Sequence, residues 1–412
     1  MIKSEVNNNE RALTVSDNIA KKVVFDIIGQ MNDVGITFSE HHGETYYLGD
    51  HSAECQAQII VHNSGFYKRL LAGGSIAAAE AYIDGWWDSP DLTQVIKVIA
   101  RNLAILDKIE AKVGWLTTIK EKWLHRSRRN NKAAAKQNIM AHYDLGNDFY
   151  RIFLDVNMLY SSGIYDQESC NLEDAQINKM DRLCQQLNLQ PSDHLLEIGT
   201  GWGALAIHAA KHYGCRVTTT TISEAQYLWA KTRIEEEGLN HQITLLLNDY
   251  RDLDGEYDKV VSVEMIEAVG KEYLTTYLKK CQALLKPDGL MAIQTITIAD
   301  QRYDNYSTGV DFIQKHIFPG GFLPSITLLT TQLTDQTDFI IRDIKDIGMD
   351  YARTLSDWHA RFNNNIEQLV QQGFDERFIR MWRYYLCYCE GGFRERSIST
   401  VQIVVSRSGW RV

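Results

Sequence analysis

Apolar runs alternate with helical periodicity along the middle of the chain. Residues 195–198 form a short apolar run carrying Glu197, and a glycine-rich turn and an alanine-rich helical pattern follow at once. Glycine lets a backbone pass close to a ligand, and a helix N-terminus offers free N–H groups there. A second predicted strand, over 215–221, comes next. The pattern predicts a βαβ unit with a ligand-binding turn after its first strand.

The same alternation continues toward the C-terminus. Apolar runs at 243–247, 259–265 and 290–298, the last preceded by a Pro-Asp-Gly turn, flank a helical pattern over 271–285. This alternation predicts a parallel sheet covered by helices on both faces. Two further strands, 339–347 and 398–406, enclose two helices. The second helix carries an aromatic stripe, which is typical of a core: Phe374, Phe378, Trp382, Tyr384, Tyr385 and Tyr388.

Composition shifts predict the domain boundaries. Residues 1–20 are polar and asparagine-rich, which predicts a disordered tail. Residues 21–118 carry short strand and helix patterns, including an amphipathic helix over 92–106, and predict a small α+β domain with either a structural or a substrate-docking role. Residues 119–136 form a basic linker, with seven basic residues and one acidic residue from 120 to 136. It is either a solvated linker or a segment that meets anionic lipid. The main domain is expected over 137–412.

Overall composition excludes several classes of protein. With 44% apolar and 23% charged residues over 412 positions, the chain is typical of a globular protein of two domains. No apolar run has the length of a membrane span, and no secretory signal is expected. Seven scattered cysteines without a metal-binding spacing fit a reducing cytoplasm and no metal site. The net charge of −10 argues against nucleic acid as a partner.

The glycine turn itself favours one cofactor. It lacks the final spacing of the dinucleotide fingerprint, and no acidic residue ends the second strand, as ribose binding would need. The form E-x-G-x-G suits S-adenosylmethionine, whose amino acid portion carries no phosphate. The alternative is a structural turn without a cofactor.

Several longer motifs carry a family resemblance. The segments HYDLGNDFY, MLYSS, EIGTGWG, TTISEAQ, NDYRDL, SVEMIEAVG, HIFPGGFLPS and DYARTLSDWHARF occur in this order, and AEAYIDGWWD precedes them. The set resembles cyclopropane-fatty-acyl-phospholipid synthases from about residue 55 onward. The resemblance implies an α/β, Rossmann-like class I methyltransferase domain with an antiparallel last strand, and an aromatic stripe that helps to wall an acyl-chain tunnel.

The resemblance also implies which residues hold the cofactor, S-adenosylmethionine. They come from the segment before the main domain's first strand, from the glycine turn, and from the ends of the next two strands. The expected set is Tyr160, Ser161, Gly199, Gly201, Thr221, Ile222, Gln226, Asp249, Tyr250 and Arg251. For Asp249, capping of a helix is the structural alternative.

In this family the base is thought to be a bound bicarbonate, and the resemblance implies its ligands here. Glu267 and Tyr351 match the family's Glu and Tyr, and Ile296 supplies the backbone position. Ser162 and Gln294 depart from the family's usual Cys and His. Serine keeps a donor, whereas glutamine cannot titrate near neutral pH. For Glu267 and Tyr351, a helix cap and a core phenol are the alternatives.

These residues imply a function. The sequence predicts methyl transfer from S-adenosylmethionine to the cis double bond of an unsaturated phospholipid acyl chain, with a cyclopropane as the leading product. Methylation without ring closure is the first alternative, motivated by Ser162 and Gln294, and small-molecule amine N-methylation is the second. A lipid-binding protein that retains only the cofactor fold is a weaker hypothesis. The expected partner is the surface of a phospholipid bilayer, met from the cytoplasmic side, and the resemblance suggests a homodimer.

Overall fold

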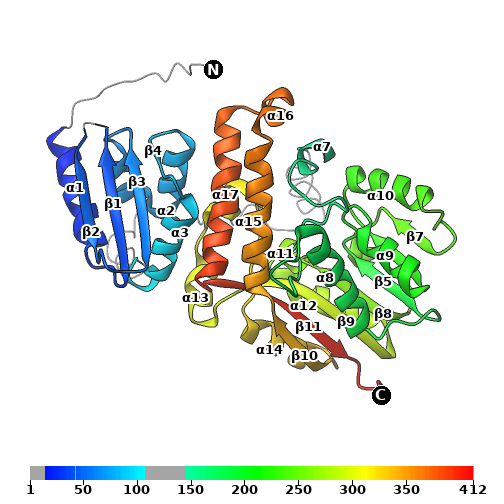
Figure 1. Cartoon of the computed structure of the whole chain (residues 1–412). Helices are drawn as coiled ribbons and strands as arrows, with labels where there is room; N and C mark the ends of the chain where they lie inside the picture. Colours follow the sequence, from blue (N-terminus) through cyan, green and yellow to red (C-terminus); the bar gives the residue numbers. More distant parts are fainter. Residues whose placement is uncertain (1–13, 42, 107–144, 412) are drawn as a thin grey trace. The chain divides into compact units, whose positions relative to one another are not determined.

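The computed structural model describes residues 14–41, 43–106 and 145–411, and it divides them into two compact units (Figure 1). The small unit contains residues up to 106 together with 374–395. The large unit contains 145–373 and 396–411. Most of the tail expected over 1–20, and the whole basic linker expected over 119–136, lie outside the described residues.

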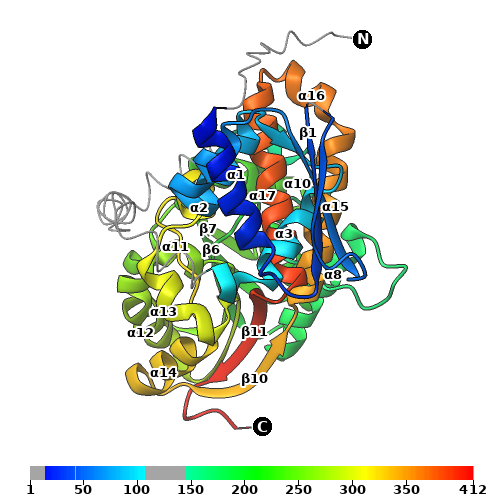
Figure 2. The ribbon, with the colours of Figure 1, turned by 90° about the vertical axis from the view of Figure 1, so that its left-hand side faces the viewer.

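The small unit is built on a four-stranded sheet in the order β2-β1-β3-β4. Strands β1 (Val34–Glu40) and β2 (Thr45–Gly49) form an antiparallel hairpin, β3 (Cys55–Val61) pairs parallel to β1, and β4 (Trp87–Asp88) pairs antiparallel to β3. Its helices are α1 (Val15–Ile28), α2 (Phe66–Ile83) and α3 (Leu92–Arg101). Helix α1 packs on α2, as Figure 2 shows in dark and light blue, and α3 packs on β3. The small unit is therefore a mixed α+β fold.

Helix α1 begins inside the stretch that composition predicts to be disordered, so that expectation is wrong for residues 15–20. Thr14 and Asp17 form a reciprocal capping box at its start. Asp17 is only 3% exposed and pairs with Lys68 at 2.7 Å. The Lys68 ammonium and the Thr14 hydroxyl lower the pKa of Asp17 to about 2. Polar composition does not reveal such long-range pairing.

Helix α17 (Glu376–Arg394) belongs to the small unit, although its sequence falls within the main domain expected over 137–412. It packs on α2 and α3. The Arg380 guanidinium donates to the carbonyls of Tyr82 and Trp87 and pairs with Asp88 at 3.1 Å. Gly391 lies so close to Ile96 that an added Cβ would come within 2.6 Å of it. Buried hydrogen bonds and close packing therefore hold α17 to residues that lie about 300 positions earlier.

The large unit carries a seven-stranded sheet in the order β10-β11-β9-β8-β5-β6-β7. The strands span β5 (His194–Ile198), β6 (Arg216–Thr220), β7 (Ile243–Leu246), β8 (Tyr257–Val263), β9 (Leu285–Ile298), β10 (Ile340–Asp346) and β11 (Ile398–Ser406). Strands β5 to β9 are parallel, and β11 is antiparallel to both of its neighbours, β9 and β10. The structure confirms the predicted α/β class with an antiparallel last strand.

Helices connect these strands. They are α7 (Asn147–Tyr150), α8 (Leu172–Gln186), α9 (Ala204–Tyr213), α10 (Glu224–Glu236), α11 (Ile266–Val269), α12 (Leu274–Leu284), α13 (Asp300–Thr308), α14 (Ile326–Gln336), α15 (Gly348–Asn364) and α16 (Ile366–Gln371), with short turns η1 (Tyr250–Asp252), η2 (Lys271–Tyr273) and η3 (Ile313–Ile317). Consecutive residues of a strand point to opposite faces of the sheet and pack into separate hydrophobic clusters. Leu195 and Val261 pack toward α8 and α9, whereas Leu196 and Val260 pack toward α12 and α14. Both faces of the sheet are therefore covered.

One local feature differs from the sequence pattern. Residues 287–289, expected to form a turn before a strand, lie inside β9, which contains a register shift against β8 between Leu285 and Leu290. Within the ranges that the structure describes, no helix combines the length and the apolar character needed to cross a bilayer.

Candidate active site

The glycine turn lies directly after β5. Gly199 and Gly201 have φ angles of 101° and 52°, backbone conformations that residues other than glycine rarely adopt. A Cβ on Gly199 would meet Met265 Cγ at 2.9 Å, whereas a Cβ on Gly201 would meet nothing within 4 Å. The turn therefore leaves open space beside Gly201, at the N-terminus of α9, where a ligand can approach the backbone. This is the carboxyl edge of a parallel sheet, where ligands of such folds bind.

The residues expected after β6 lie at the same edge. Thr221 and Gln226 are buried, and the Thr221 hydroxyl donates to Gln226 Oε1 at 2.9 Å. Ile222, between them in the chain, is half-buried. Ser223 caps α10 by accepting from the main chain of Gln226. The cap fixes the start of α10 and therefore the position of the Gln226 side chain. The side-chain amide of Gln226 can donate hydrogen bonds to a polar ligand.

The residues expected after β7 are arranged differently. Asp249 accepts from the main-chain N–H of Arg251 and pairs with its guanidinium at 2.7 Å, so it caps η1, as the structural alternative expected. The side chain of Tyr250 packs in the core, with its ring edge-on to Tyr277 at 5.2 Å. Burial raises the pKa of Tyr250 to about 12. Contacts of these three residues with a cofactor stay predictions.

The loop at residues 160–162 joins the expected cofactor set to the expected anion set. The Tyr160 ring packs against Tyr150 at 5.3 Å and against Trp358 at 5.4 Å. Ser161, which is 5% exposed, accepts a 2.6 Å hydrogen bond from Lys179 Nζ on α8. Lys179 is buried, and burial lowers its pKa to about 8, against the opposing effect of nearby carboxylates.

Glu264, directly after β8, gathers three of the five residues expected to bind an anion. Its Oε1 accepts from the main-chain N–H of Ser162 and from Gln294 Nε2, both at 2.9 Å. Its Oε2 accepts from the Tyr351 hydroxyl on α15, also at 2.9 Å. The topology therefore brings a loop, the end of β8, the strand β9 and a distant helix to one carboxylate. The structure brings Ser162, Gln294 and Tyr351 together at this carboxylate.

The other two residues expected to bind an anion, Glu267 and Ile296, contact one another. Glu267 lies three residues after Glu264 in the chain. Glu267 Oε1 accepts from the main-chain N–H of Ile296 and from the Thr295 hydroxyl at 3.0 Å. Its second oxygen, Oε2, is buried and makes no hydrogen bond within the described part of the chain. Burial and the nearby Glu264 carboxylate raise the pKa of Glu267 to about 8. Glu267 therefore holds a proton near neutral pH.

Glu264 lies among more donors than Glu267. Burial raises the pKa of Glu264 as well, but the Ser162 N–H, the Gln294 amide, the Lys179 ammonium and the Tyr351 hydroxyl all oppose this rise. Of two neighbouring carboxyls that share one site, the one with more donors carries the charge. We therefore assign the ionised state to Glu264 and the protonated state to Glu267.

The Gln294 amide is held in one orientation. Its Oε1 accepts from Gln402 Nε2 at 3.0 Å, across the β9–β11 pair. Gln402 Oε1 accepts from Arg182 Nε at 3.0 Å. This chain fixes the amide group so that both Gln294 N–H groups point toward Glu264 Oε1 and the Ser162 carbonyl. Glutamine thus supplies a neutral donor of fixed direction.

Glu264 and Lys179 are site residues that the sequence patterns do not predict. Glu264 lies in the SVEMIEAVG motif, of which the family resemblance assigns a role to Glu267 alone. Its φ angle of 50° is unusual for a residue with a side chain, and a strained acidic residue at the end of a buried strand marks a functional position. Lys179 has no motif. A lysine on the buried face of an amphipathic helix was the available signal.

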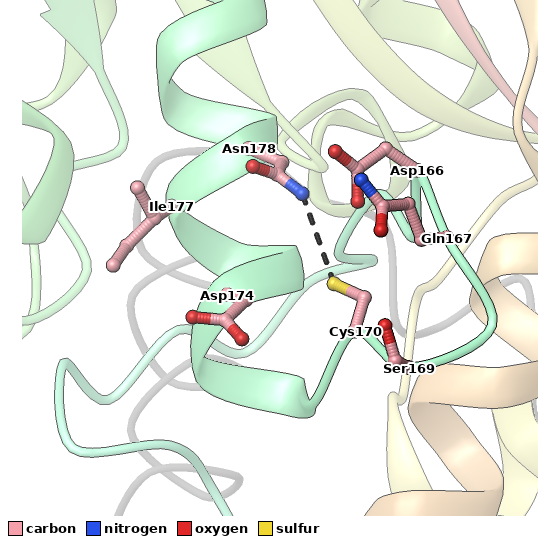
Figure 3. A pocket seen from close by; sticks show the side chains of 7 residues that line it. All are labelled: Asp166, Gln167, Ser169, Cys170, Asp174, Ile177 and Asn178. Carbon is pink, nitrogen blue, oxygen red and sulfur yellow. Dashed lines mark hydrogen bonds between the residues drawn. The ribbon is translucent and has the colours of Figure 1, made fainter.

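A separate surface depression of about 280 Å³ lies around the start of α8 (Figure 3). It is lined by Asp166, Gln167, Ser169, Cys170, Asp174, Ile177 and Asn178. None of the residues predicted for catalysis or cofactor binding is among them. In the part of the chain that the structure describes, no group of His, Cys, Asp or Glu residues is arranged to hold a metal ion.

Comparison with known proteins places this site in a family. The family model described as mycolic acid cyclopropane synthetase matches residues 130–403. A tuberculostearic acid methyltransferase of Mycobacterium tuberculosis is 38% identical over 85% of this chain and 83% of its own length. The cyclopropane-fatty-acyl-phospholipid synthase of Escherichia coli K12 is 37% identical over 85% of this chain and 88% of its own.

Solved structures agree. A cyclopropane synthase from Mycobacterium tuberculosis matches with a TM-score of 0.61 and 29% identity, over 66% of this chain and 98% of that one. A mycolic acid cyclopropane synthase complexed with SAH and CTAB gives 0.62 and 30%, with the same coverage. Coclaurine N-methyltransferase, at 20% identity and a TM-score of 0.61, shares the fold alone. The chain therefore belongs to the mycolic acid cyclopropane synthetase family and is an S-adenosylmethionine-dependent methyltransferase.

Proposed function

We propose that this enzyme methylates the cis double bond of an unsaturated phospholipid acyl chain and closes a cyclopropane ring. One observation carries the proposal. Ser161, in the expected cofactor set, and Ser162, whose N–H binds the Glu264 carboxylate, are consecutive residues. Methyl donor and proton acceptor must both reach one methyl carbon, and this loop brings their expected sites together.

The bound cofactor supplies an electrophilic methyl group, which an isolated double bond needs because it is a weak nucleophile. The chain's own part is to orient the alkene and to keep water from the cation that forms on it. The aromatic cluster around Tyr160 suits this task. Phe153, Phe318 and Trp358 lie with their ring centroids 5.4–6.3 Å from the Tyr160 ring. Aromatic faces stabilise positive charge in a dry site.

Ring closure then requires a base. Loss of one proton from the transferred methyl lets the C–H electron pair form the last ring bond, and the product gains CH2 overall. The half-buried residues Glu264 and Glu267 at the end of β8 lie among donors that control their protonation, as a general base requires. The relatives named for cyclopropane synthesis support this outcome.

One alternative product has support of its own. A relative at 38% identity is named as a tuberculostearic acid methyltransferase, and another, from Pseudomonas putida, as a probable fatty acid methyltransferase. Gln294, in place of the family's His, cannot accept a proton. If the cation loses a proton from a neighbouring chain carbon, the product keeps a double bond in the chain and carries a methyl branch. A methylene branch forms if a hydride first shifts from the methylated carbon to the cationic carbon and the methyl group then loses the proton.

Lipid analysis separates these outcomes. The full chain is expressed in a bacterial host without its own cyclopropane synthase, with methyl-labelled methionine, and fatty acids are analysed by gas chromatography and mass spectrometry. We expect a labelled CH2 gain that survives mild hydrogenation. A labelled product that takes up hydrogen supports the branched alternative. Absence of label from every lipid contradicts both and points to a different acceptor, such as an amine.

We further propose that the enzyme works on the cytoplasmic surface of a phospholipid bilayer, where its substrate resides. Helix α1 supports this proposal because Val15, Ile19 and Val23, spaced four residues apart on one face, are 79%, 61% and 40% exposed. The basic run at 120–136 supports attraction to anionic lipid. We expect Ile19→Asp to weaken co-sedimentation with phosphatidylglycerol vesicles, whereas Asn18→Asp, an equal charge change at an exposed neighbour, should not. Equal loss in both variants would contradict a role for the apolar face.

A further inference from the structure

The expected bicarbonate site already contains an anion that belongs to the chain. Glu264 receives hydrogen bonds from Ser162, Gln294 and Tyr351, which are three of the five residues that the family resemblance assigns to bicarbonate. A carboxylate and a bicarbonate present the same planar O–C–O group to donors. The remaining two positions, Glu267 and Ile296, bind one another instead.

The donors at this site have no capacity for a second anion. Ser162 has one N–H, which it gives to Glu264, and its hydroxyl donates to the Gly163 carbonyl at 2.9 Å. Gln294 gives one N–H to Glu264 and the other to the Ser162 carbonyl at 3.3 Å. The single hydroxyl hydrogen of Tyr351 goes to Glu264. A bicarbonate placed here would have to displace Glu264 from all three residues.

Charge opposes a second anion as well. Glu264 lies near Glu267, and the cation that acts on Glu264 is Lys179. The family's His could become cationic and balance an added anion, whereas Gln294 stays neutral. The residues of this chain therefore do not fit bicarbonate.

The backbone conformation of Glu264 is unusual and is fixed by a hydrogen bond. It has a φ angle of 50°, a strained conformation for a side-chain-bearing residue. Its own N–H donates to the Gln294 carbonyl at 2.7 Å, which fixes this conformation. The turn directs the carboxylate inward, into a half-buried position between the loop at 160–162, β9 and α15. Such strain persists only where surrounding contacts impose it, and it concentrates at functional sites.

We infer that Glu264 itself is the catalytic base and takes the place of bicarbonate. This inference rests on the proposed function. One Glu264 oxygen accepts the proton from the transferred methyl group, the C–H electron pair closes the ring, and Glu264 becomes a neutral carboxylic acid. The proton passes to water when the product leaves. Gln294 and Tyr351 are positioning residues that hold the carboxylate ionised until that step.

Bicarbonate dependence tests the inference without any variant. The purified full chain is assayed in carbon-dioxide-free buffer with methyl-labelled S-adenosylmethionine and vesicles of phosphatidylethanolamine that carry monounsaturated chains. We expect the same rate with and without added bicarbonate. A several-fold stimulation of the wild-type enzyme would overturn the inference while leaving the proposed function intact. Absence of lipid labelling under both conditions would refute the proposed function, and the inference with it.

Two variants sharpen the result. Glu264→Gln should lower turnover by about 100-fold or more, which is the size of a general-base contribution, while calorimetry shows unchanged binding of S-adenosylmethionine. Glu264→Gly removes the carboxylate and opens its place, so added bicarbonate or acetate should restore activity saturably. Glu256→Gln, at an exposed position before β8, is the matched control and should keep full activity. Full activity of Glu264→Gln would overturn the inference.

Discussion

Tyr351→Phe tests how this site keeps the half-buried Glu264 carboxylate charged. The substitution removes one hydroxyl and little volume, so the 5% exposed ring keeps its packing beside Trp358. It also removes the 2.9 Å hydrogen bond to Glu264 Oε2. A hydrogen bond to a charged group contributes about 1.5 to 3 kcal/mol. Since one pKa unit corresponds to about 1.36 kcal/mol, the pKa of Glu264 should rise by about 1 to 2 units.

The assay is the pH dependence of kcat/KM for methyl transfer to phospholipid vesicles. If Glu264 must be ionised to act, activity is lost as pH falls through its pKa, so Tyr351→Phe should move this acid limb to higher pH. Tyr165→Phe is the matched control, because Tyr165 makes a similar 2.7 Å hydrogen bond to Asp357, outside the cluster. An acid limb that stays in place in Tyr351→Phe, or that moves equally in both variants, would refute the reasoning.

Three further predictions concern other parts of the molecule. Burial raises the pKa of Glu267 to about 8, so the folded state keeps a proton that the unfolded state releases near pH 4.3. Glu267 therefore contributes a fall in the free energy of unfolding as pH rises from about 4 to about 8. Glu267→Gln removes this contribution, so its melting temperature should fall less, or rise more, over this range than that of the wild type. The variant should also lose most activity while it retains cofactor binding. Arg380→Leu should lower the free energy of unfolding, measured with denaturant, by about 2 to 4 kcal/mol, because it removes the donor of two buried carbonyls. Arg377→Leu is the control. The Arg377 side chain is 65% exposed, so this substitution should cost less than about 1 kcal/mol. Gly199→Ala should weaken S-adenosylmethionine binding in calorimetry by about tenfold, since an alanine there costs about 1 to 2 kcal/mol of backbone strain and meets Met265 at 2.9 Å; unchanged affinity would contradict the role of this turn.

The sheet of the large unit could be predicted from the sequence because each strand is a short apolar run between turn signals. The predicted range of β11, 398–406, agrees with the structure, and those of β5 and β7 differ from it by one residue at one end. Burial on both faces makes such runs conspicuous. Helix α17 illustrates the limit. An aromatic stripe predicts a buried helix, but it does not say against which part of the chain the helix packs.

The chemistry at Glu264 could not be predicted for a related reason. Its donors come from positions 162, 294 and 351, so no local spacing connects them. Only the strand order, with β9 beside β8 and α15 returning over this edge, brings them to one carboxylate. The motif resemblance supplied these residues individually. It assigned them to an external anion because it did not show that the chain provides one.

The position of α17 in the sequence has a consequence for biosynthesis. Domains usually fold in order as they leave the ribosome, but the small unit lacks a helix until residues 374–395 have been made. Until then α2 and α3 lack the partner that covers Ile96 and satisfies the carbonyls of Tyr82 and Trp87. Strand β11, which lies between β9 and β10, is made later still. Both units therefore complete their folding at nearly the same moment of translation, and a ribosome that stalls before residue 374 would leave both with uncovered apolar surface for chaperones to protect.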